Sequence, residues 1–231
     1  RGAALALGLI DLRSLEDRLL RASDMQVVGA TEARLALGAV APDAARGTTL
    51  AELATQPGFA EAFLELWDAL RRAGIDRDDF VRLADRLGRA GARSGSTGLS
   101  ARRFAALARI AAAYEDRLRA REVVDGAGAR LRLPAALAEL SPGRVRALLD
   151  GASVLEFDGI GEVSIVRARM LEALAQAGVR VRVILPEVPP NLAAAELSAA
   201  LELSRRNLVD KAPSVELVAR PLARAGLLAF V

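Results

Sequence analysis

The chain shows two kinds of hydrophobic pattern, helical in its first two thirds and strand-like in its last third. Apolar residues recur at i, i+4, i+7, i+8 and i+11 from Phe59 to Leu70, and further stripes run from Phe80 to Leu87 and from Phe104 to Leu118. A shorter stripe lies in DLRSLEDRLLRA at 11–22. Apolar positions at this spacing share one face of a helix, so the pattern predicts amphipathic helices that pack together.

From residue 141 onward, short apolar runs alternate with helical repeats. SVLEF at 153–157, VRVRVIL at 179–185 and SVELVA at 214–219 have the length and composition of strands, and helical patterns separate them. Strands joined through a helix are parallel, with right-handed crossovers. The sequence therefore predicts an α/β fold in which a parallel sheet adjoins an all-helical part.

The composition removes several classes of chemistry. Hydrophobic residues make up 52% of the 231 positions, which allows a sizeable core, but histidine and cysteine are absent. Disulfides, thiol nucleophiles, zinc sites and histidine-containing triads are therefore excluded. The 32 basic and 29 acidic residues leave a net charge of +3, too small to indicate nucleic acid by itself. No apolar run approaches the roughly 20 residues that span a bilayer, so we expect a cytoplasmic protein without a membrane partner.

An acid and two glycines follow the first predicted strand. Asp158, Gly159 and Gly161 stand at the carboxyl end of a parallel strand, where such sheets bind ligands. In a Walker B strand Asp158 would hold Mg²⁺, but Gly159 replaces the second acid, and the chain has no GxxxxGK[ST] loop. We expect a degenerate nucleotide or metal site, with no cofactor in this segment and Mg-ATP as the alternative.

Two other interpretations of this stretch stay open. GIGEVS approximates the dinucleotide motif G-x-G-x-x-G/A with Ser164 in the third position, although the acid for the ribose would have to be Glu187, which comes late and after a proline. Alternatively, the glycines only permit a tight turn from strand to helix, and Asp158 only ends the strand.

Three successive segments carry a family resemblance: TLAELATQPGFAEAFLELWDALRRAGID, LARIAAAYEDRLRAREVVDGAGARL and ASVLEFDGIGEVSIVRARMLEALAQAGVRVRVILP. Residues 50–186 resemble the helicase-like region of the B subunit of AddAB-type helicase-nucleases and related PD-(D/E)XK nuclease-family proteins. Phe157 and Asp158 match a strand end that stands in for Walker B, with Glu156 in place of a glycine. The family's helix-end pattern is matched by Tyr114, Leu118, Val124 and Asp125.

The resemblance implies the architecture of UvrD-like superfamily 1 helicases, a RecA-like parallel sheet with an inserted or adjoining all-helical subdomain. Residues 1–49 would form the N-terminal part of the RecA-like domain, 50–140 the helical subdomain and 141–231 its parallel βαβαβ portion. Because the phosphate loop and the second acid are missing, the resemblance implies a catalytically silent, DNA-binding scaffold of a bacterial double-strand-break repair helicase-nuclease. The chain would be a fragment of a longer nuclease or helicase, with a helicase subunit as its partner.

The implied DNA contact is independent of base sequence and applies to single-stranded or duplex DNA. Arginine suits it because a guanidinium binds phosphate with two parallel hydrogen bonds. Trp67 and Tyr114 lie on apolar stripes, which places them in the core rather than on a base-stacking surface. The candidate phosphate ligands are Arg93, Arg102, Arg103, Arg167 and Arg169.

Two functions of other classes remain as alternatives. One is a nucleotide- or dinucleotide-binding α/β enzyme domain that uses Asp158 to Ser164. The other is a non-catalytic protein-assembly module, which binds neither nucleotide nor DNA.

Overall fold

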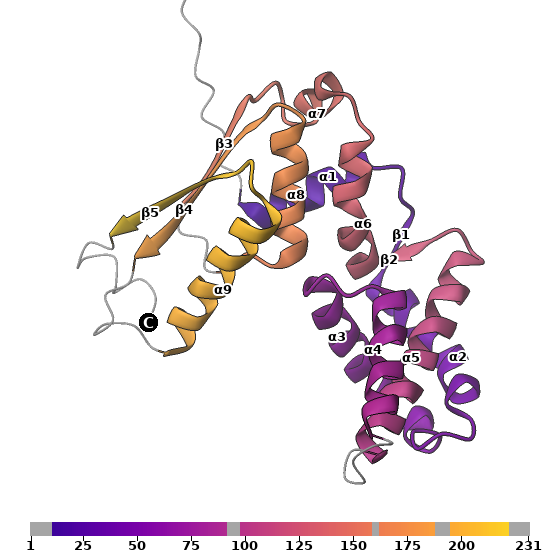
Figure 1. Cartoon of the computed structure of the whole chain (residues 1–231). Helices are drawn as coiled ribbons and strands as arrows, with labels where there is room; N and C mark the ends of the chain where they lie inside the picture. Colours follow the sequence, from indigo (N-terminus) through magenta and orange to yellow (C-terminus); the bar gives the residue numbers. More distant parts are fainter. Residues whose placement is uncertain (1–10, 92–97, 159–161, 188–194, 222–231) are drawn as a thin grey trace, which may run out of the picture. The chain divides into compact units, whose positions relative to one another are not determined.

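The computed structural model describes residues 11–91, 98–158, 162–187 and 195–221 (Figure 1). Contacts divide the chain into two units: Met25–Arg132 forms one, and the residues described on either side of it form the other. The first unit is helical with two short strands, and the second combines a parallel sheet with helices. The predicted mixed α/β class is confirmed, with helix as the larger share. The domain boundaries at 50 and 141 stay predictions.

The sheet unit is built on three parallel strands in the order β3 (Val154–Asp158), β4 (Arg180–Glu187) and β5 (Glu216–Pro221). Helices α8 (Ile165–Gln176) and α9 (Ala195–Lys211) make the two crossovers and lie on the same face of the sheet (Figure 1). This is the strand, helix, strand order that the sequence predicted. The buried residues that face these helices are Leu155, Phe157, Val181, Val183 and Leu185.

The opposite face of the same sheet carries charged side chains. Arg182 on the central strand lies between Glu156 and Glu216 on its two neighbours, with nitrogen–oxygen distances of 3.2 and 3.0 Å. The alternation of apolar and charged residues along β3 and the first half of β4 matches a sheet with one covered face.

Two further helices lie wholly within this unit. In α1 (Leu12–Ala22), Asp11 caps the first turn by accepting from Ser14 N at 2.9 Å. In α7 (Pro142–Leu148), Ser141 accepts from Arg144 N at 3.3 Å, and the proline occupies the first helical position. A proline has no N–H to leave unpaired there, so it suits this position.

The helical unit packs around aromatic residues. Its long helices are α2 (Ala30–Ala45), α3 (Phe59–Arg72), α4 (Arg77–Gly91) and α5 (Gly98–Arg119), with a short 3₁₀ helix at Leu53–Thr55. Trp67 and Phe80 join α3 to α4 with ring centroids 5.4 Å apart. Trp67 and Tyr114 are both fully buried, so their predicted place in the core is confirmed. Gly74 ends α3 in the left-handed conformation, with φ of 77°.

Two short strands connect distant parts of the helical unit. β1 (Val27–Val28) pairs in parallel with β2 (Val124–Asp125), and α6 (Gly126–Ala138) begins at the next residue. Asp125 thus stands where a strand turns into a helix.

The carboxylate of Asp125 is buried and bonded on all sides. Arg71 forms ion pairs with both Asp125 and Glu115, and its own side chain is only 4% exposed. The Tyr114 hydroxyl donates to one Asp125 oxygen at 2.8 Å, and Gly128 N donates to the other at 2.7 Å. A Cβ at Gly128 would come within 3.0 Å of both Arg71 and Asp125, so a side chain there would require these two groups to shift.

No helix in the described part of the chain is both long and apolar enough to cross a membrane.

Replacing Asp125 with alanine is expected to destabilise the helical unit by about 3–5 kcal/mol, because the buried charge of Arg71 would lose one of its two carboxylate partners and the Tyr114 hydroxyl would lose its acceptor. Asp116 gives a matched control: its ion pairs with Arg77 and Arg119 are exposed, and Asp116→Ala should cost less than about 1 kcal/mol. Chemical denaturation measures both. If both variants lost the same free energy of unfolding, the buried ion pair of Asp125 would be no more important than an exposed one.

Burial raises the pKa of Tyr114, and the charge of Asp125 raises it further. The unfolded chain has the ordinary tyrosine pKa of 10.0, so its tyrosine loses the proton first. The stability that Tyr114 contributes is therefore complete below pH 10 and declines as the pH rises above it. Tyr114 is the only tyrosine, so tyrosinate absorbance reports on it alone. We expect no tyrosinate until the protein unfolds; ionisation near pH 10 in the folded protein would contradict the buried hydrogen bond.

Candidate functional site

The end of β3 holds the candidate nucleotide or metal ligand. Asp158 is the last residue of this strand, and its carboxylate is about half exposed on the charged face of the sheet. Arg220 of β5 forms an ion pair with it, so the pair crosses the sheet from one edge strand to the other. Asp158 therefore already has a counterion from the protein.

The backbone at Val163, just before α8, is held by α9. Val163 is fully buried; its N–H donates to Ser204 Oγ at 2.8 Å, and its carbonyl accepts from Asn207 Nδ2 at 2.8 Å. The Ser204 hydroxyl donates in turn to the carbonyl of Ala200 at 2.8 Å. Both backbone groups of Val163 are thus satisfied inside the protein, as burial requires.

The start of α8 is used to build the helix. Ser164, the third position of the dinucleotide-like motif, is the N-cap residue and accepts from Arg167 N at 3.3 Å. The guanidinium of Arg167 lies against buried Glu16 of α1, with Nε 2.8 Å from Oε1. The hydrogen bond to Glu16 raises the pKa of Arg167. Of the candidate phosphate ligands, Arg167 therefore has its charge paired within the sheet unit.

The other candidates differ in their surroundings. Arg102 and Arg103 are exposed on the first turns of α5, and Arg169 is exposed on α8. None of these three forms an ion pair with another described residue. Gly159, Gly161 and Arg93 lie outside the described residues.

Within the residues that the structure describes, no cluster of three or more acidic side chains is placed to hold a metal ion. The sequence pattern did not indicate three side chains that shape this region: Arg220, Ser204 and Asn207. Ser204 and Asn207 lie three residues apart on α9, on a buried face of this helix. Two polar residues at this spacing were the signal in the sequence that could have indicated a buried hydrogen-bonding role. Their partner Val163 lies more than forty residues away in the chain, so no local pattern could reveal it.

Comparison with known protein families finds no matching family model, and no curated protein matches the sequence.

Replacing Ser204 with alanine should destabilise the sheet unit by about 1–3 kcal/mol, because the N–H of Val163 would be buried without an acceptor. Ser198 is exposed on the same helix, and Ser198→Ala supplies the matched control with little expected change. Thermal or chemical denaturation of both variants makes the comparison. A loss no greater than in the control would show that the hydrogen bond to Val163 N does not hold this segment.

Proposed function

We propose that this chain is a catalytically silent, helicase-like domain that binds DNA through its phosphates, as a scaffold of a bacterial double-strand-break repair helicase-nuclease. The observation that carries the proposal is the ion pair of Asp158 with Arg220 at the end of β3. A Walker B acid must leave its carboxylate available to Mg²⁺, and a second acid must follow it. Here an arginine takes the carboxylate, and Gly159 follows in the sequence.

A RecA-like architecture is the framework of this proposal. Three parallel strands in sequential order, joined by helices, are compatible with part of such a domain. Two residues of the helix-end pattern are in direct contact, since Tyr114 donates to Asp125. Their contact gives the resemblance a physical basis at that position, because replacing either residue would leave a buried polar group unpaired.

The proposed DNA contacts come from Arg102, Arg103 and Arg169. All three are exposed, and their charges are not neutralised by described acids. Such guanidinium groups can bind phosphate without the cost of breaking an ion pair. Arg167 is a weaker candidate on the same argument, because Glu16 already binds it. Buried Trp67 and Tyr114 offer no stacking surface, so the contacts would be to the backbone and independent of base sequence.

The proposal includes a cytoplasmic location, a helicase subunit as partner and no cofactor in this segment. A nuclease active site would lie elsewhere in the parent protein. In this arrangement the domain supplies position and charge, whereas its partners supply ATP hydrolysis and strand cleavage.

Fluorescence anisotropy with labelled single-stranded and duplex oligonucleotides, at stepped salt, tests this function. We expect affinity that falls log-linearly with salt, ignores base sequence and does not change with Mg-ATP. The triple variant with Arg102→Gln, Arg103→Gln and Arg169→Gln should show a less steep decline of log K with log salt. The slope should become less negative by about 0.7 for each lost contact to single-stranded DNA.

The matched control combines Arg13→Gln, Arg21→Gln and Arg205→Gln, which removes the same charge from exposed positions on α1 and α9. An equal loss of DNA affinity in both triple variants would show that only the net charge matters. It would contradict the assignment of the contacts to Arg102, Arg103 and Arg169. A folded protein that binds no DNA at low salt would contradict the function and favour an assembly module. A response to Mg-ATP that Asp158→Ala abolishes would favour the nucleotide-binding alternative.

A further inference from the structure

A cleft lies at the opposite end of the sheet from Asp158, where the strands begin. It has a volume of about 590 Å³ and is lined by Ala175, Ser214 and the stretches 153–154 and 178–180. These residues come from the starts of β3 and β4, the end of α8 and the approach to β5. The cleft thus belongs entirely to the sheet unit.

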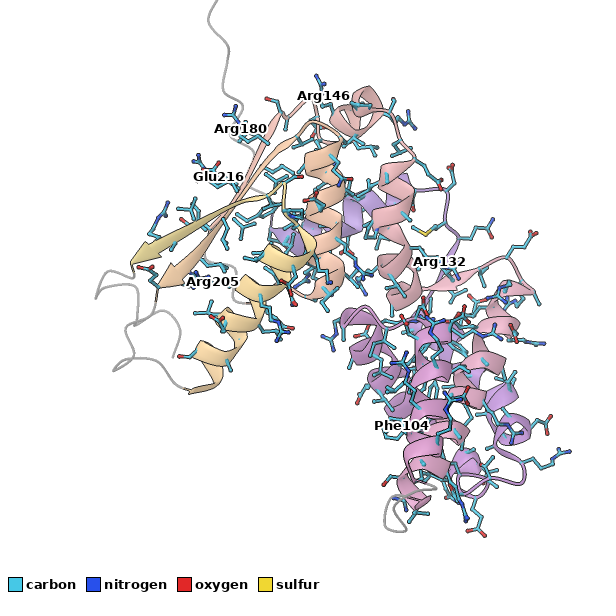
Figure 2. The ribbon with its side chains drawn as sticks, viewed as in Figure 1. Phe104, Arg132, Arg146, Arg180, Arg205 and Glu216 are labelled. Atoms are coloured by element: carbon cyan, nitrogen blue, oxygen red, sulfur yellow. The ribbon has the colours of Figure 1, made fainter. Side chains whose placement is uncertain are left out.

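Two arginines bring positive charge to this cleft. Arg180 lines it directly, at the first position of β4. Arg146 comes from α7, and its Nη2 is 4.0 Å from the place where a Cβ on Gly178 would stand. Figure 2 shows both arginines at the end of the sheet near α7. Neither is paired with an acid among the described residues.

The acids nearest to this end of the sheet already have partners. Asp150 is paired with Arg18, and Glu216 with Arg182. Glu172 is buried, and its two oxygens accept from Ser214 N and Oγ at 2.8 and 2.7 Å. The charges of Arg146 and Arg180 are therefore available to a ligand, although Glu172 behind the wall makes the cleft less positive than these two arginines alone would.

A glycine forms part of the cleft wall. Gly178 lines the cleft and precedes β4 with a φ of 85°. In this region of backbone conformation a side chain is strained, so glycine is favoured at this turn. The exposed hydroxyl of Ser153 makes no hydrogen bond with any described residue, so it can donate to a ligand. The Ser214 hydroxyl cannot, because it donates to Glu172.

We propose that this cleft binds a phosphate group, held by the guanidinium groups of Arg146 and Arg180 with Ser153 as an additional donor. Arginine pairs favour phosphate because each guanidinium offers parallel N–H donors that match two phosphate oxygens. The group could belong to a nucleic-acid backbone or to a small phosphorylated molecule, since both present the same oxygens. The inference does not rest on the proposed DNA function, which uses other arginines.

The test uses inorganic pyrophosphate and a single-stranded oligonucleotide as separate probes, at low salt in a buffer free of phosphate. Isothermal titration calorimetry measures the first and fluorescence anisotropy the second. We expect pyrophosphate to bind the native chain, and the double variant R146Q/R180Q to bind it about tenfold more weakly, since each lost arginine removes charge-assisted hydrogen bonds.

The control variant R89Q/R205Q removes the same charge from exposed positions on α4 and α9; Arg205 lies away from the cleft in Figure 2. Thermal unfolding of both variants verifies that they remain folded. Two outcomes support the inference. Loss of both pyrophosphate and oligonucleotide affinity in R146Q/R180Q alone identifies a nucleic-acid phosphate, and loss of pyrophosphate affinity alone identifies a small phosphorylated ligand.

Two outcomes overturn it. The first is that the native chain binds no pyrophosphate. The second is that R89Q/R205Q loses as much pyrophosphate affinity as R146Q/R180Q. The failure of this inference is distinguishable from failure of the proposed function, because pyrophosphate affinity in R146Q/R180Q tests the cleft, whereas DNA affinity in the Arg102, Arg103 and Arg169 triple variant tests the proposed DNA contacts.

Discussion

The helical unit is organised around the hydrogen bonds and the ion pair of the buried Asp125 carboxylate. A charge removed from water costs several kcal/mol unless an opposite charge and hydrogen bonds replace the solvent. Arg71, Tyr114 and Gly128 N together supply those bonds. Since they come from α3, α5 and α6, satisfying one carboxylate fixes the ends of three helices beside the β1–β2 pair. A side chain at Gly128 would press on Arg71 and Asp125.

The sheet unit is organised by a different constraint, a sheet covered by helices on one face. The covered face is apolar, whereas the other face pairs its charges across strands, with Arg182 between two glutamates and Arg220 on Asp158. Asp158 therefore belongs to a set of cross-strand ion pairs. Exposed pairs of this kind contribute little to stability.

Local patterns predicted the elements whose signals are local. The three parallel strands and the helices that contain the apolar stripes from Phe59, Phe80 and Phe104 all follow from short stretches of sequence. Helix α2 was not predicted, because its apolar residues surround the helix and Pro42 lies inside it. Burial of Ala41 and Ala45 stabilises it nevertheless.

The contacts that define the sites could not be predicted in the same way. Arg167 and Arg169 are two arginines of the same predicted helix, and the sequence alone does not distinguish them. In the structure, Arg167 forms an ion pair with buried Glu16, whereas Arg169 is exposed. Arg71 and Asp125, like Ser204 and Val163, lie far apart in the chain. Only folding brings such partners together, so sequence reasoning could name the residue types for a site but not the side chains that would already be paired.

We propose that DNA contacts arginines on α5 and α8, and that the end of β3 does not bind Mg-ATP. Hydrogen-exchange mass spectrometry, with single-stranded DNA and with Mg-ATP in separate experiments, tests it most directly because it locates each effect in the chain. DNA should slow exchange in peptides that cover the start of α5 and α8, and Mg-ATP should leave peptides that contain the end of β3 unchanged. Slower exchange at the end of β3 with Mg-ATP, or no effect of DNA on α5, would contradict the claim.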